Sequence, residues 1–141
     1  MADLYTTRVS ATGGRHGTIK SEDGILAASL AMPKILGGPG GATNPEQLFA
    51  AGYAACFENA ILRVARDSGI RFADPDVEVI AEIGLHRSDN GGFGLSAKLE
   101  VTLAGVDQTR AEEIVRHADA ICPYSNAVRG NVAVAIIVRA K

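Results

Sequence analysis

One uncharged helical segment restricts the fold of this chain more than any other feature. Asn44 can cap a helix, Pro45 suits the first helical position, and Glu46 falls in the first turn, so a helix begins here. It extends to about Ser68 and contains the stretch Leu48–Phe57, which has no charge on any face. A helix that is apolar all round must be surrounded by other parts of the protein.

The rest of the chain offers little to cover that helix. With 141 residues and only one other substantial helix, a single copy would struggle to surround it. The helix either lies in a core under two sheets or is buried at an obligate dimer interface. The shortage of covering elements favours the dimer. Small side chains would also let another backbone approach closely, at Ala50, Ala51, Gly52, Ala54 and Ala55.

Alternating apolar residues and turn signals predict the other elements. Six strands are expected, at Leu4–Thr12, Arg15–Ser21, Ile25–Ala31, Val77–Arg87, Phe93–Ala104 and Asn131–Arg139. A second helix fits Gln108–Ala120 and must end by Cys122, because Pro123 cannot continue it. Strands grouped in this way, rather than alternating with helices, predict an α+β fold in a single domain over residues 1–141.

Charge and hydropathy argue against several classes of function. The net charge of −2 gives no basic surface for nucleic acid or for an anionic membrane. The N-terminus has no apolar core of a signal peptide, and the longest aliphatic run, Val132–Val138, is too short to span a bilayer. We therefore expect a soluble, cytoplasmic protein that binds neither nucleic acid nor a membrane.

The sequence lacks the usual motifs for phosphate binding, acyl transfer and metal binding. The glycine-rich loop Gly37–Gly41 precedes a helix but lacks the ending of a P-loop, which favours a hinge over a phosphate cradle. No G-x-S-x-G motif is present. His16, His86 and His117 are scattered along the chain, so neither a metal nor another cofactor is expected.

Two cysteines, Cys56 and Cys122, are the remaining candidates for reactive groups. A permanent disulfide is not expected in a reducing compartment, and two cysteines are too few for structural zinc. Burial of Cys56 deep in its helix should raise its pKa, so it needs a nearby cation such as Arg15 to react. Cys122, at a helix end before Pro123, is expected to be mobile and accessible. Composition alone leaves the role of both thiols open.

Two long motifs resemble those of one protein family. The first, at residues 44–57, reads NPEQLFAAGYAACF, and the second, at residues 122–131, reads CPYSNAVRGN. Both resemble the organic hydroperoxide resistance proteins, a branch of the osmotically inducible protein C-like (OsmC-like) superfamily, and the likeness covers essentially the whole chain. This resemblance implies an α+β fold in which antiparallel sheets wrap around the long central helices of an intertwined homodimer.

The resemblance also implies roles for the site residues. Cys56 would be the peroxidatic cysteine and Cys122 the resolving cysteine, with Arg15 and Glu46 as the polar pair that activates Cys56. A dithiol, typically on a lipoylated protein, would recycle the disulfide. The implied activity is the thiol-dependent reduction of organic hydroperoxides to alcohols.

Residue chemistry gives these roles a mechanism. Only a thiolate attacks the O–O bond, and the Arg15 guanidinium would favour the thiolate and bind the oxygen on which negative charge develops. Glu46 could orient that guanidinium in a bidentate pair. Attack would give a sulfenic acid and then a disulfide. Apolar and aromatic side chains around the nucleophile favour alkyl or lipid hydroperoxides over hydrogen peroxide: Leu48, Phe49, Tyr53 and Phe57.

Helix geometry indicates a site shared between two chains. Glu46 and Cys56 are ten residues apart on one helix, and hence about 15 Å apart. If two copies of the helix cross antiparallel near Gly52, Glu46 of one chain approaches Cys56 of the other. Each site would then combine the two cysteines of one chain with Arg15 and Glu46 of its partner.

Two other interpretations stay open at this point. The chain could belong to the sister osmotically inducible branch, with a different substrate range or reductant. It could instead be a small-molecule-binding or structural dimer module whose cysteines are merely buried.

Overall fold

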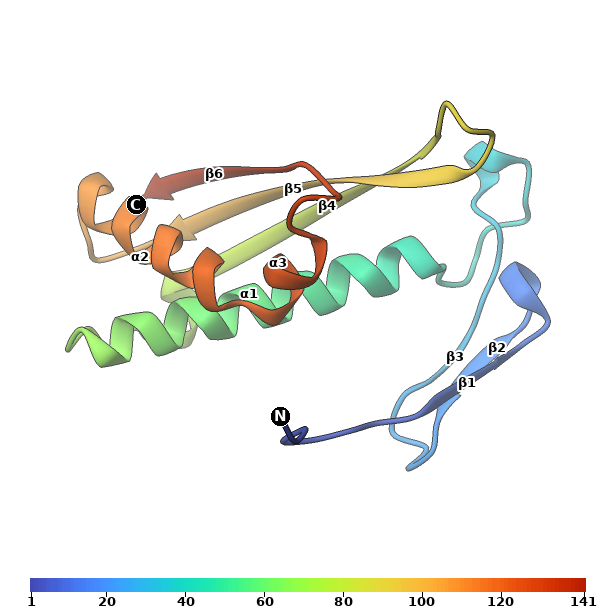
Figure 1. The fold of residues 1–141 in the computed structure, drawn as a ribbon, viewed down its shortest axis with the longest axis horizontal. Coiled ribbons are helices and arrows are strands. Elements are labelled where there is room, and N and C mark those ends of the chain that lie inside the picture. The colour runs from blue at the N-terminus through green and yellow to red at the C-terminus, as the bar shows by residue number, and fades with distance from the viewer. The chain divides into compact units, whose positions relative to one another are not determined.

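The computed structural model describes residues 1–141 as two compact units, Met1–Leu48 and Phe49–Lys141. Grouped strands confirm the α+β class. Short 3-10 turns lie at Gly14–His16, Lys34–Leu36 and Asp74–Asp76. The helices and strands follow in the order shown in Figure 1: β1 (Val9–Thr12), β2 (Thr18–Ser21), β3 (Ala27–Ser29), α1 (Pro45–Asp67), β4 (Val77–Arg87), β5 (Phe93–Leu103), α2 (Gln108–Ile121), α3 (Pro123–Val128) and β6 (Val134–Ala140).

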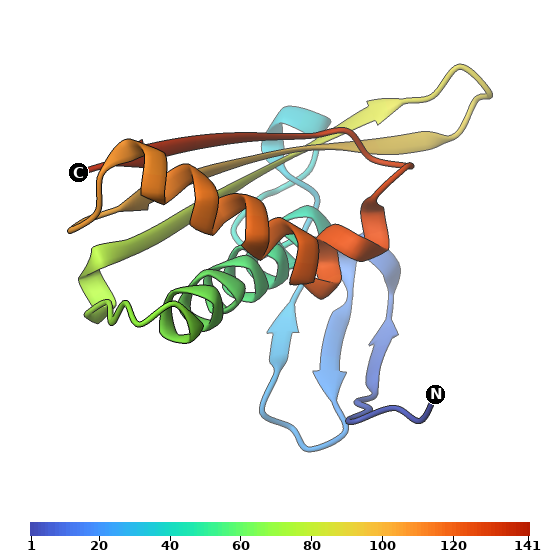
Figure 2. The same cartoon turned by 60° about the vertical axis from the view of Figure 1, so that its left-hand side comes forward.

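The first unit is a small antiparallel sheet with the strand order β1-β2-β3. Figure 2 shows the three strands of this sheet side by side. All three strands are shorter than the sequence predicted, because few of their side chains have a core to pack against. Within this unit only four residues are buried: Ile19, Ser21, Leu30 and Ala31.

A glycine turn between β1 and β2 carries Arg15. Gly13 and Gly14 have φ angles of 80° and 57°, in a region that other residues rarely adopt. A Cβ atom at Gly17 would collide with the carbonyl oxygen of Thr12. The turn therefore requires glycine at these positions, and its fixed backbone sets the position of Arg15.

The second unit holds a three-stranded sheet in the order β4-β5-β6. β4 and β5 pair antiparallel over their full lengths, from Val77 opposite Leu103 to Arg87 opposite Phe93. β6 runs parallel to β5, so the expectation of purely antiparallel sheets is wrong for this pair. The crossover through α2 and α3 explains the difference, because it returns the chain to the end of the sheet where a parallel strand must start.

One face of this sheet forms the core together with α1 and α2 (Figures 1 and 2). On β5, Leu99, Val101 and Leu103 are fully buried, whereas the intervening Glu100 and Thr102 are partly exposed on the opposite face. Four residues of α2 close the core at the helical spacing that the sequence predicted: Ala111, Ile114, Val115 and Ala118.

A single chain covers only one face of α1. Tyr53, Phe57 and Ile61 are buried in the core, whereas Ala51 and Ala55 are exposed. Of its apolar 18-residue window, 28% is buried. By length and composition alone this helix could cross a membrane, a test that the core helices of soluble proteins also pass. Its open face carries small side chains suited to a close neighbour.

The chain turns sharply at Cys122, between α2 and α3. Pro123 ends α2, as predicted, and also opens α3, a helix that the sequence did not predict. Proline is favoured at a first helical position because the N–H that it lacks has no helical partner there. Arg129 braces the corner by donating to the carboxylate and to the carbonyl oxygen of Asp119, at 3.3 and 2.9 Å. Cys122 therefore lies on a corner that these contacts hold, and its mobility stays a prediction.

Candidate active site

The two cysteines lie next to each other in the second unit. Cys56 projects from α1, and Cys122 occupies the corner between α2 and α3. Their sulfur atoms are 3.6 Å apart, and both thiols are free. A disulfide bond is about 2.05 Å long, so an approach of about 1.5 Å would close it. The pair can therefore form a disulfide with only a small movement.

The two thiols differ in accessibility. Cys122 is 0% exposed because the corner directs its side chain into the core, so the expectation that it is accessible is wrong. Cys56 is only partly buried and packs against the edge of that core. A molecule arriving from solvent can therefore meet Cys56 before Cys122.

The surroundings of Cys56 favour its neutral thiol. Burial raises the pKa of Cys56, as the sequence predicted; the backbone N–H of Tyr124 opposes that shift, and the neighbouring Cys122 thiol adds to it. None of these groups is a cation. Because the thiolate is the nucleophilic form, activation of Cys56 requires positive charge from another source.

Side chains of α3 contact α1 close to the sulfur atoms. The hydroxyl oxygens of Tyr53 and Ser125 share a hydrogen bond of 2.8 Å. The ring of Tyr124 lies over Gly52, where a Cβ atom would come within 2.5 Å of the Tyr124 hydroxyl oxygen. Gly52 accommodates Tyr124 of the same chain, and the crossing of two helices near Gly52 stays a prediction.

A cavity of about 630 Å³ opens beside Cys56. It lies between α1, which contributes Ala60 and Val64 as well as Cys56, and α2, which contributes His117. Arg63 adds a second basic group to its lining. The lining is mixed, with the polar or charged residues Asn59, Asp67 and Ser68 beside the apolar Ile121 and Pro123. The cavity gives a small molecule access to the sulfur of Cys56.

Arg15 and Glu46 form a bidentate ion pair within the first unit. Nη1 and Nη2 of Arg15 donate to Oε2 and Oε1 of Glu46 at 2.9 and 2.5 Å. The hydrogen bond from Arg15 lowers the pKa of Glu46, and the same bond raises the pKa of Arg15. The two side chains remain 30% and 17% exposed. Arg15 is therefore charged, oriented and still accessible to another group.

The four apolar residues expected around the nucleophile occupy different environments. Tyr53 and Phe57 are buried in the core of the second unit, with 1% and 0% exposure. Phe49 packs against that core, and Leu48 is half-buried at the end of the first unit. Tyr53 and Phe57 belong to the core that desolvates Cys56, and contact of the four residues with substrate stays a prediction.

Two polar contacts near the sulfur atoms were missed by sequence reasoning. They are the backbone N–H of Tyr124 toward Cys56 and the bond between Tyr53 and Ser125. Both depend on α3. Pro123 at a first helical position was the available signal, because a helix starting there places Ser125 within the same turn.

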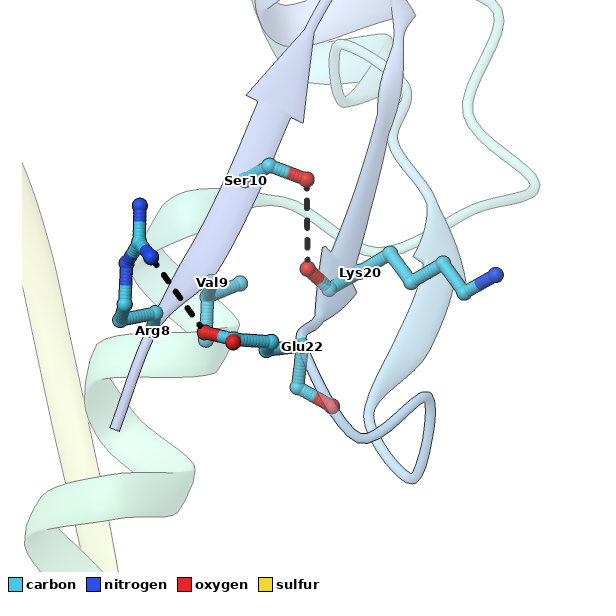
Figure 3. A pocket seen from close by; sticks show the side chains of 6 residues that line it. Arg8, Val9, Ser10, Lys20 and Glu22 are labelled. Atoms are coloured by element: carbon cyan, nitrogen blue, oxygen red, sulfur yellow. Dashed lines mark hydrogen bonds and ion pairs between the residues drawn. The ribbon is translucent and has the colours of Figure 1, made fainter. Parts of the chain in front are cut away.

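A second hollow, of about 350 Å³, lies along β1 and β2 in the first unit. Figure 3 shows Arg8 directed toward Glu22, an exposed ion pair of 3.7 Å. It also shows Ser10 donating to the backbone carbonyl oxygen of Lys20 at 3.3 Å. No thiol lines this hollow, and we assign no chemistry to it.

Comparison with known proteins places the chain in a family. The OsmC-like protein family matches residues 38–137. The organic hydroperoxide resistance protein of Xanthomonas axonopodis pv. citri is 44% identical over 134 residues, which cover 94% of this chain and 93% of that protein. The organic hydroperoxide resistance protein OhrB of Bacillus subtilis is 43% identical over 130 residues, covering 92% and 93%.

Solved structures agree with the sequence comparison. An organic hydroperoxide resistance protein from Legionella pneumophila has a TM-score of 0.93 at 50% identity, covering 98% of this chain and 99% of that one. One from Vibrio cholerae, with captopril bound in one of its active sites, has a TM-score of 0.93 at 45% identity, covering 98% and 94%. Because identity exceeds 40% over nearly the whole length, this chain belongs to the OsmC-like family and, within it, to the organic hydroperoxide resistance branch.

Proposed function

We propose that this protein is a cysteine-based peroxidase that reduces organic hydroperoxides to alcohols. One observation carries the proposal: two free thiols lie 3.6 Å apart, one beside a cavity and the other in the core. That arrangement suits a nucleophile that meets the oxidant and a second thiol that then closes a disulfide. Membership of the organic hydroperoxide resistance branch supports the same chemistry.

The reaction begins at Cys56. Its thiolate attacks the terminal oxygen of R–O–OH, the O–O bond breaks, and that oxygen stays on sulfur as a sulfenic acid. The alkoxide R–O⁻ leaves and takes up a proton to become the alcohol. The Cys122 thiol then attacks the sulfenic sulfur, which forms the disulfide and releases water. The short distance between the sulfur atoms makes this second step effectively unimolecular and fast.

We infer that Arg15 and Glu46 activate Cys56 across a homodimer. Cys56 requires a cation, and Arg15, held by Glu46, can supply one that also stabilises the leaving alkoxide. Ten helical residues separate Glu46 from Cys56 by about 15 Å. Ala51 is the midpoint between them and is exposed, so antiparallel contact of two α1 helices at Ala51 would bring Glu46 of each chain to Cys56 of the other.

The oligomer has one more support in addition to that geometry. The middle of α1 leaves the apolar Ala51 and Ala55 exposed within a single chain, and only 28% of the helix's apolar 18-residue window is buried. An intertwined homodimer would cover the helix and pair each set of cysteines with an Arg15 from the other chain.

The proposed substrates are alkyl or lipid hydroperoxides, and the proposed reductant is a dithiol. The cavity of about 630 Å³ beside Cys56 has room for an organic chain. Thiol–disulfide exchange would return both cysteines to thiols and leave the dithiol as its own disulfide, with a lipoylated protein as the donor. We place this cycle in the cytoplasm, where catalytic disulfides are transient.

Counting thiols tests the proposed function. One equivalent of cumene hydroperoxide should remove both thiols of the reduced chain and yield one equivalent of cumyl alcohol. Dihydrolipoamide should then restore both thiols. Unchanged thiols in the folded protein would support a non-catalytic binding module instead. Restoration by thioredoxin but not by dihydrolipoamide would keep the peroxidase and reject the lipoyl donor.

A further inference from the structure

A buried pair of hydroxyl groups connects the two helices that hold the cysteines. Tyr53 Oη and Ser125 Oγ are 2.8 Å apart, and their residues are 1% and 2% exposed. Burial raises the pKa of Tyr53, so its hydroxyl stays protonated and either oxygen can donate. A hydrogen bond enclosed in this way is protected from competition with water and depends strongly on its geometry.

This hydrogen bond lies about one helical turn away from the two sulfur atoms. Tyr53 lies three residues before Cys56 on α1, and Ser125 lies three residues after Cys122 on α3. Residues three apart on a helix share a face and are separated by about 4.5 Å along its axis. The helix faces that bring the sulfur atoms to 3.6 Å are thus also joined about one turn away, at 2.8 Å.

We propose that the Tyr53–Ser125 hydrogen bond is a positioning device that holds Cys122 within reach of Cys56 and sets how readily their disulfide closes. The use of that disulfide in turnover rests on the proposed function, but the effect on the two thiols does not. Tyr124 of α3 also contacts α1, through its backbone N–H toward Cys56 and through its ring, which lies over Gly52 and against the rings of Phe49 and Tyr53. The ring contacts are packing contacts, which depend less strictly on direction than a hydrogen bond does. Tyr53 and Ser125 act through Cys122 and are positioning residues.

Two measurable quantities depend on this position. When α3 is held less firmly against α1, the effective concentration of the Cys122 thiol at Cys56 falls. The disulfide then becomes less stable and forms more slowly. A sulfenic acid that waits longer for Cys122 meets a second peroxide more often and is oxidised to sulfinic acid. Loss of the hydrogen bond therefore weakens the disulfide and increases over-oxidation of Cys56.

Two substitutions that each delete one oxygen atom test the proposal: Tyr53→Phe and Ser125→Ala. The fraction of disulfide in glutathione buffers gives its equilibrium constant without any peroxide. Each substitution should lower that constant roughly tenfold, the size expected for losing one partner of a buried hydrogen bond. The equilibrium constant of the double variant should be no lower than the lower of the two single-variant constants, because all three variants lack the same hydrogen bond. Sulfinic acid at Cys56 per turnover, measured by mass spectrometry, should rise in the same variants.

Ser21→Ala is the matched control. Ser21 is also a buried serine, 7% exposed, and its hydroxyl donates to Asp23 at 2.6 Å in the first unit. Its loss should lower the thermal unfolding midpoint and leave the glutathione constant unchanged. Constants within about twofold of wild type for both Tyr53→Phe and Ser125→Ala would overturn the proposal, whatever their thermal stability.

Two further outcomes separate the proposals. Additive losses in the double variant would also overturn the positioning role, because they would mean that the two hydroxyls act independently. If peroxide oxidises no thiol while the glutathione constants fall as expected, the proposed function fails and the positioning role stands.

Discussion

The two units of the chain differ in how much core each contains. In Phe49–Lys141, a continuous core joins α1, α2 and the sheet, with Phe57 and Leu99 fully buried. In Met1–Leu48, only four residues are buried. An apolar surface of this extent on a short segment indicates that another surface covers it. The large apolar residues that this unit exposes are Met1, Leu4, Tyr5, Val9, Ile25, Leu26, Ile35 and Leu36.

The proposed active site divides along the same boundary. Cys56 and Cys122 belong to the unit with its own core, whereas Arg15 and Glu46 belong to the unit without one. A segment that must find a covering surface is suited to act on a partner chain. Under the proposed function, the two thiols would be part of the unit with its own core, whereas their activation would depend on assembly.

The largest expected effect is the loss of the nucleophile. Cys56→Ser should lower the rate of cumene hydroperoxide reduction by on the order of 10⁴-fold or more, because an alcohol is a far poorer nucleophile than a thiolate. Cys122→Ser, which alters the other thiol of the same unit, should complete one turnover and then stop. Normal steady turnover of Cys122→Ser with a dithiol would show that Cys122 is not the resolving cysteine.

Removal of the cation should separate activation from the scaffold. Arg15→Ala should lower kcat/KM for peroxide about 10²- to 10³-fold, as expected when a group that stabilises developing charge is lost. Arg15→Lys keeps the charge but not the planar fork, so it should restore only part of the activity. Iodoacetamide alkylation of Cys56 should shift to higher pH in Arg15→Ala. Superimposable alkylation curves for wild type and Arg15→Ala would exclude Arg15 as the activating cation.

Dilution should lower the amide protection of the first unit before that of the second. If Met1–Leu48 is covered by a partner chain, the amides of β1–β3 lose protection when the dimer dissociates, whereas those of β4 and β5 keep it. Hydrogen exchange, measured at protein concentrations above and below the dimer dissociation constant, reports the amide protection of both sheets in one experiment. Equal protection of β1–β3 at both concentrations would show that the first unit does not depend on a partner.

The smallest expected effect is the pH dependence of the ion pair. Because Arg15 lowers the pKa of Glu46 below its ordinary 4.5, the pair stabilises the fold above that pH and loses this contribution as the pH falls through the lowered pKa. Both side chains are partly exposed, so the contribution near neutral pH is at most about 1 kcal/mol. Denaturant unfolding of wild type and Glu46→Gln should differ by that amount and converge in acid. A difference that grows on acidification would contradict the sign.

The helices and the long hairpin could be predicted because local chemistry specifies them. The Asn44-Pro45 start of α1 was correct, and the helix ends one residue before the predicted Ser68. β4 was predicted to the residue and β5 to within one, because alternating side chains on both strands face a core. In β1–β3 the same alternation gave strands that were too long, because no core of their own supports them.

The corner at Cys122 could not be predicted, and most of the differences follow from it. Pro123 indicated the end of one helix and is also compatible with the start of another, but a single proline does not decide whether a second helix follows. The inward direction of Cys122 and the parallel pairing of β6 depend on the same corner. Tyr53 and Ser125 are 72 residues apart, and no local pattern encodes their contact. Local residue chemistry and the family motifs, in contrast, identified the cysteines and the Arg15–Glu46 pair.

A mixed dimer tests most directly whether each site joins the cysteines of one chain to Arg15 of another. Cys56→Ser and Arg15→Ala homodimers should both be inactive or nearly so. In a heterodimer purified through two different affinity tags, a shared site places both defects in one active site and leaves the other intact. Peroxide turnover per heterodimer should then be about half that of wild type, since one of two equivalent sites works. Turnover no higher than that of the Arg15→Ala homodimer would show that each chain builds its site from its own residues.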